Sequence, residues 1–174
     1  NFGLVSRETL LLMNNVLLVV ATGSVLLGTL YPLLIDALGM GKLSVGPPYF
    51  NAVFVPVMVP LLILLAVGPL AQWKHADLRA IALRLRLSLA LAVIAGIALP
   101  LLMGGWTAMT AMSSLLAVWI AASSVFQIID RLKTGTPPAA YWGMHLAHLG
   151  IAVFVIGVAM VGGYQEEKDV RMEP

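Results

Sequence analysis

The sequence has 174 residues, of which 60% are hydrophobic and only 10% are charged. A soluble domain averages about 25% charged residues, so this composition predicts an integral membrane protein. The chain contains no cysteine, which excludes disulfides, thiolate ligands and covalent attachment of a cofactor through its own thiols. A net charge of +2 does not indicate a nucleic-acid partner.

Several apolar runs are long enough to cross a bilayer, which takes about 20 helical residues. We expect an all-α, polytopic membrane protein with one transmembrane helical region over residues 1–174. Its spans are expected at about 9–34, 51–73, 84–103, 107–129 and 141–163. The short connection GGW at 104–106 predicts that the third and fourth spans form an antiparallel hairpin.

The basic residues predict the orientation of these spans. Seven lie beside one end of the set: Arg7, Lys74, Arg79, Arg84, Arg86, Arg131 and Lys133. The other end has only Lys42, Lys168 and Arg171. Because excess Lys and Arg mark the cytoplasmic side, we expect a cytoplasmic N-terminus and a periplasmic C-terminus in a bacterial inner membrane.

The segment KHADLRAIALRLR at 74–86 alternates apolar and basic residues at helical spacing. It predicts an amphipathic helix on the cytoplasmic surface that leads into the third span. A solvated helical extension is the simpler interpretation, and binding of anionic lipid headgroups is the alternative.

The two ends of the sequence suggest a piece of a longer protein or a processed chain. The first residue is Asn1, and the last eleven residues, YQEEKDVRMEP, form a charged stretch without a closing element. Neither end resembles a signal peptide.

Two histidines, His145 and His148, lie inside the fifth span, about 6 and 10 Å deep at the rise of an α-helix. Such a histidine can pack and hydrogen-bond to another helix, relay protons, bind a metal such as zinc, or ligate haem iron. Zinc normally needs three or four ligands, and the one further histidine is His75. A relay would need an acidic partner, and Asp36 lies at the opposite side. The residues alone favour packing over haem ligation. We expect His145 to reach water or headgroups near the interface, and it is the less favoured candidate for a haem ligand.

Asn14 and Asn15 lie in the first turns of the first span, at about the depth of His148. An amide there could hydrogen-bond the second nitrogen of a liganding imidazole. Asparagines at this depth more often join helices to one another, which is the favoured interpretation.

Short motifs along nearly the whole chain resemble one family. They are SRETLLLMNNVLLV (6–19), LLGTLYPL (26–33), GPPYFN (46–51), MVPL (58–61), GPL (68–70), YWGM (141–144), AHLG (147–150) and EKDVRM (167–172). In this order and spacing they resemble the C-terminal part of the CcmF and NrfE haem lyase subunits of bacterial cytochrome c maturation.

That resemblance implies a membrane protein that takes haem from a periplasmic chaperone and joins its vinyl groups to the two CxxCH thiols of an apocytochrome c. It also implies a resident b haem, held within the membrane between histidines of two helices. His148, in the AHLG motif, takes the place of one axial ligand, whereas His145 lies outside the motif and inherits no role. The expected partners are the N-terminal part of the same lyase, other membrane subunits of the maturation system, the chaperone, the apocytochrome and membrane lipid.

The sequence lacks several features of the family. The tryptophan-rich WWD segment, the two periplasmic histidines and the second b-haem ligand are absent. We therefore expect a fragment or split-gene product that contributes one haem ligand and no complete catalytic site. The alternatives are a non-catalytic membrane scaffold, whose histidines only pack helices, or a haem-transport subunit.

Overall fold

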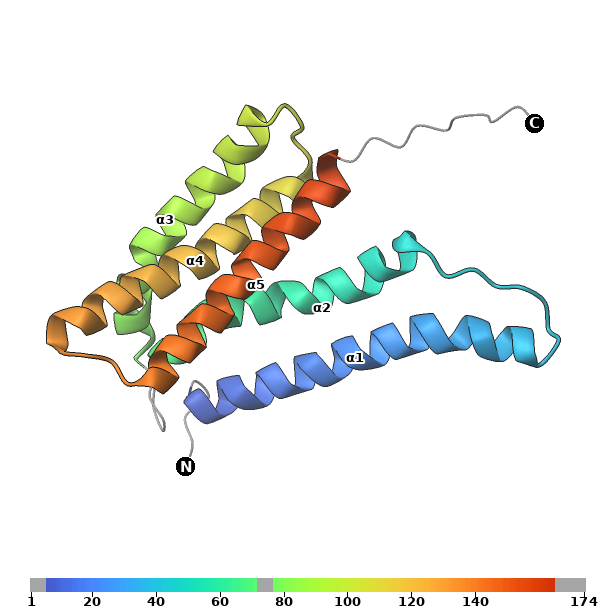
Figure 1. Cartoon of the computed structure of the whole chain (residues 1–174), viewed down its shortest axis with the longest axis horizontal. Coiled ribbons are helices and arrows are strands. Elements are labelled where there is room, and N and C mark those ends of the chain that lie inside the picture. The colour runs from blue at the N-terminus through green and yellow to red at the C-terminus, as the bar shows by residue number, and fades with distance from the viewer. Residues whose placement is uncertain (1–5, 72–76, 165–174) are drawn as a thin grey trace. The chain divides into compact units, whose positions relative to one another are not determined.

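The fold was analysed in a computed structural model, which describes residues 6–71 and 77–164. These residues form five long α-helices and a short 3-10 turn (Figure 1). All five helices are long and apolar enough to cross a membrane, so the expected all-α, five-span architecture is confirmed. The orientation of the ends stays a prediction. The chain divides into two compact units, residues 1–84 and 85–174, which are described separately.

Each helix is longer than its expected span or begins at a different residue. The helices are α1 (Arg7–Ala37), α2 (Pro47–Val67), α3 (Leu78–Leu102), α4 (Ala108–Thr134) and α5 (Ala139–Tyr164), with the turn η1 (Gly68–Leu70) after α2. The largest differences are at the end of α2 and at the start of α3, each of which lies six residues before the expected one. Helix α4 ends five residues later than expected, and α2 begins four residues earlier. Proline fits the first helical position because its missing N–H would have no intrahelical partner there, which explains the start at Pro47.

In the first unit, α1 begins at a serine cap. The Oγ of Ser6 accepts a 3.2 Å hydrogen bond from the backbone N–H of Thr9. Further along the helix, the hydroxyls of Thr22, Ser24 and Thr29 each donate 2.8 Å bonds to the carbonyl four residues earlier. Polar groups in hydrocarbon must be satisfied within the protein, and these local bonds do so.

Helix α1 packs on α2 through a glycine. A Cβ atom at Gly28 would lie 2.6 Å from Cε1 of Tyr49 and 3.0 Å from Cζ of Phe50, so only glycine leaves room for these rings. The Tyr49 hydroxyl then donates a 3.0 Å hydrogen bond to the carbonyl of Ser24, which ties the start of α2 to the middle of α1.

In the second unit, α3 and α4 pack closely through Gly96. A Cβ there would lie 2.9 Å from Cβ of Leu115 and 3.1 Å from the carbonyl oxygen of Ala111. This contact, with α3 ending at Leu102 and α4 beginning at Ala108, agrees with the expected antiparallel hairpin.

Helices α4 and α5 form the main contact of the second unit (Figure 1). Thr107 and Thr110 cap α4 reciprocally, each backbone N–H donating to the other hydroxyl at 3.0–3.1 Å. The packed faces are rich in small and hydroxyl-bearing side chains, as is common between membrane helices. Those buried on α4 include Thr110, Ser113, Ala117, Ser123 and Ser124.

Candidate functional site

Helix α5 carries both membrane histidines on or beside its buried face. His145, Ala152 and Ala159 are buried and seven residues apart, which places them on one side of the helix. His148 is only partly buried and lies next to that side. The two imidazoles are therefore close in space but differ in what surrounds them.

His145 is fully buried, with 0% of its surface exposed. Its ring meets that of Tyr141 edge to face at a centroid distance of 4.5 Å. Neither ring nitrogen has a hydrogen-bond partner among the described residues. The expected contact of His145 with water or headgroups is thus not what the structure shows, because this side chain lies on the packed face of its helix.

His148 is held by its own helix. Its Nδ1 atom lies 2.7 Å from the carbonyl oxygen of Met144. A carbonyl can only accept a hydrogen bond, so Nδ1 carries a proton, and in the neutral ring Nε2 then keeps its lone pair. Nε2 makes no hydrogen bond with any described residue. A neutral imidazole fixed in this tautomer is suited to bind a metal ion through Nε2.

The two imidazoles do not make a metal site by themselves. Their centroids are 6.2 Å apart and their planes are tilted by 54°. Among the described residues, no group of three or more His, Cys, Asp or Glu side chains could hold a metal ion. His75 lies outside the described residues. An axial haem position, in contrast, needs only one imidazole from this chain.

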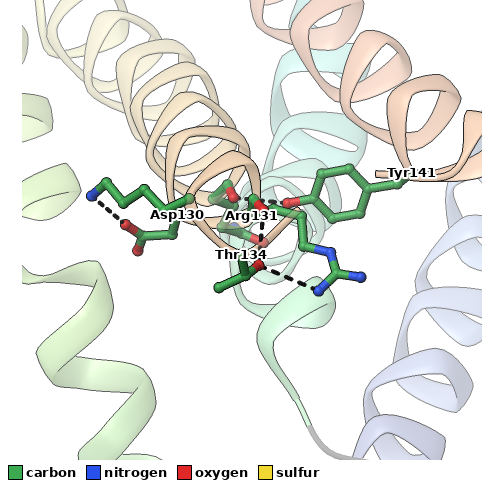
Figure 2. A network of polar contacts seen from close by, with 6 residues as sticks. Asp130, Arg131, Thr134 and Tyr141 are labelled. Carbon is green, nitrogen blue, oxygen red and sulfur yellow. Dashed lines mark hydrogen bonds and ion pairs between the residues drawn. The ribbon is translucent and has the colours of Figure 1, made fainter. Parts of the chain in front are cut away.

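Tyr141 fixes the first turn of α5 against α4. Its hydroxyl donates a 2.9 Å hydrogen bond to the carbonyl of Gln127. Figure 2 shows the Tyr141 side chain pointing toward the end of α4 on the side of Arg131, while Asp130 points to the other side. Sequence reasoning missed this residue, although an aromatic side chain four positions before His145 is the spacing at which two helical side chains meet.

Asn14 and Asn15 belong to the first unit and the histidines to the second. Asn14 is partly buried and lies on the same side of α1 as Ala21 and Gly28, the side that packs on α2. Asn15 is exposed. The favoured interpretation, in which such an amide joins neighbouring helices, stays a prediction.

The known proteins that this chain resembles are named cytochrome c-type biogenesis proteins. The chain is 46% identical over 184 residues to the cytochrome c-type biogenesis protein CcmF of Pseudomonas fluorescens. It is 44% identical over 180 residues to CcmF of Escherichia coli strain K12 and 31% identical over 185 residues to NrfE of Haemophilus influenzae. Each match covers 99% of this chain. The chain is a homologue of the CcmF-type cytochrome c biogenesis proteins.

The chain spans 27% of the length of these relatives. No family model matches it, and no solved structure does. The five helices and these relatives support a multi-pass membrane location.

Proposed function

We propose that this chain is part of a haem lyase of cytochrome c maturation and that His148 is one axial ligand of a membrane-embedded b haem. The single observation that carries the proposal is the 2.7 Å contact between His148 Nδ1 and the Met144 carbonyl. It leaves Nε2 as the nitrogen for iron and fixes the plane of the ring. The partly buried position of His148 supports the same role, because a ligand must be reachable from outside its own helix.

The second axial ligand and most of the haem pocket would come from the part of the lyase that this chain does not cover. The relatives are almost four times as long as the matched segment, which leaves ample length for further helices. When bound, the b haem supplies one-electron chemistry, which suits the need for ferrous iron in thioether formation. This chain's contribution is to orient one imidazole and to shield it with α4 and α5.

Asn14 and Asn15 are proposed to support the cytoplasmic end of that site. The charge asymmetry of the sequence supports a cytoplasmic N-terminus, a periplasmic C-terminus and the inner membrane as location. The proposed partners are the remaining lyase helices, other membrane subunits of the maturation system, a haem chaperone and apocytochrome c, whose CxxCH thiols receive the haem.

A non-catalytic scaffold is the second candidate. The observation that favours it is His145, a buried imidazole that contributes to the contact between two helices and has no outlet to a ligand. A scaffold role predicts that both histidines act through packing alone, so that no cofactor depends on either of them.

The test is a reduced-minus-oxidised absorption spectrum of the intact membrane protein. We expect a b-type signal that is lost in His148→Ala and kept in His145→Phe, a control that preserves the ring volume of the neighbouring histidine. A b-type signal that survives in His148→Ala would show that His148 is not the haem ligand. The absence of b haem from the unmodified protein would favour the scaffold.

A further inference from the structure

The first turns of α3 carry three arginines without acidic partners. Arg79, Arg84 and Arg86 are all exposed, and none forms an ion pair with a carboxylate of the described residues. Near the end of α4, in contrast, Lys133 pairs with Asp130 at 3.1 Å. Arg79 lies in the first turn of α3, where a cation opposes the helix dipole, so its charge does not stabilise the helix.

The length of α3 places these arginines at the edge of the membrane. Counting about 20 residues back from Leu102, the number that spans the hydrocarbon core, reaches Leu83. Arg79 then lies about 6 Å outside the hydrocarbon, and Arg86 within its outermost 5 Å or so. Long arginine side chains extend from this depth to the phosphate groups.

Two of the three arginines share one face of α3. Arg79 and Arg86 are seven residues apart, which is nearly two full turns. The buried stripe of the helix, at Ile81, Leu85 and Ser88, lies on the opposite side. Arg79 and Arg86 therefore lie on the exposed face of α3.

Arg84 has a different environment. It lines a shallow hollow together with Asp77, Leu70, Ala80 and Ile81, so an acidic side chain lies on its side of the helix. Asp77 also accepts hydrogen bonds of 2.9 and 3.2 Å from the backbone N–H groups of Arg79 and Ala80. The amides at the start of α3 are thus already engaged, and an anion would have to be bound by guanidinium groups.

Helix geometry directs both arginines of the outer face toward the headgroup region. Side chains on an α-helix tilt toward its N-terminus, so those of Arg79 and Arg86 both extend away from the apolar part of α3. Their Cα atoms are about 10.5 Å apart along the axis, and the flexible Arg86 side chain can reach the headgroup layer in which Arg79 lies. Guanidinium groups suit a phosphodiester because they donate two parallel hydrogen bonds to its oxygens.

We infer that Arg79 and Arg86 form a binding site for the headgroup of an anionic phospholipid, with the acyl chains lying along the exposed apolar side chains that follow on α3. Leu83 and Leu87, which are 54% and 57% exposed, are available for that contact. The inference goes beyond the proposed haem-lyase role and does not depend on it.

The test is a lipid titration of the detergent-solubilised intact protein, in which native mass spectrometry resolves the individual binding steps. The probes are phosphatidylglycerol and, as the uncharged counterpart, phosphatidylcholine. We expect the first phosphatidylglycerol step to be weakened about fivefold in Arg79→Gln and in Arg86→Gln, with phosphatidylcholine binding unchanged.

Arg84→Gln is the matched control, because it removes the same charge from the side of α3 that carries Asp77. It should leave the first phosphatidylglycerol step unchanged. An equal effect of all three substitutions would show that phosphatidylglycerol binding depends on overall surface charge, and it would overturn the inference. Equal binding of the two lipids by the unmodified protein would overturn it as well.

Discussion

His145 and His148 lie 6.2 Å apart, centroid to centroid, yet one ring is sealed inside the protein and the other is open at its edge. Three residues along an α-helix turn a side chain by about 60° from its neighbour. On α5 this rotation places His145 on the buried face of the helix and His148 at the edge of that face. One turn of α5 thereby presents one imidazole for packing and one for a ligand.

The margin position of His148 predicts chemical rescue. In His148→Ala we expect added imidazole to restore the b-type absorption, because the space left by the side chain is open on one side. The control is His145→Phe treated in the same way, in which added imidazole should change nothing. A b-type spectrum that is present in His148→Ala before imidazole is added would contradict ligation by His148.

The contact of Gly28 with α2 predicts a clear difference between two glycines of α1. Gly28→Ala should lower the stability of the protein in detergent by roughly 1–3 kcal/mol, the usual cost of overpacking, because its Cβ would meet the Tyr49 ring. Gly23→Ala is the matched control, since nothing lies within 4 Å of a Cβ there. Thermal unfolding followed by intrinsic fluorescence measures both. Similar melting temperatures for the two variants would show that α1 and α2 do not pack as described.

The hydrogen bond from Tyr141 to the Gln127 carbonyl predicts a smaller effect. Tyr141→Phe keeps the ring against His145 but removes the donor, and should cost about 1 kcal/mol. Tyr31→Phe is the control, because Tyr31 is 46% exposed and its hydroxyl bonds to no described residue. Thermal unfolding of the two variants under the same conditions would reveal the difference, and its absence would argue against a stabilising role for the bond.

The sequence was sufficient to predict the number of spans, because each apolar run is separated from the next by charges, glycines or prolines. It could not predict which side of each helix is buried. The environment of His145 depends on the face that α4 covers, and α5 is apolar on every side, so no periodicity marks that face. The close approach at Gly28 was equally hidden, since a glycine in a membrane helix has the same appearance whether or not a ring lies against it.

The burial of His145 without hydrogen-bond partners predicts an unusual order of stabilities. Replacing it by alanine should cost roughly 3 kcal/mol, because the lost ring leaves a cavity between α4 and α5. Replacing it by phenylalanine keeps the volume and the edge contact with Tyr141 and removes two polar nitrogens that no described residue satisfies. Burying such groups is costly, so His145→Phe should equal or exceed the unmodified protein in melting temperature. The melting temperature of His145→Phe could instead fall as far as that of His145→Ala. The imidazole nitrogens would then make hydrogen bonds in the assembled protein that phenylalanine cannot replace. In that case His145 would be a functional side chain of α5, as is proposed for His148.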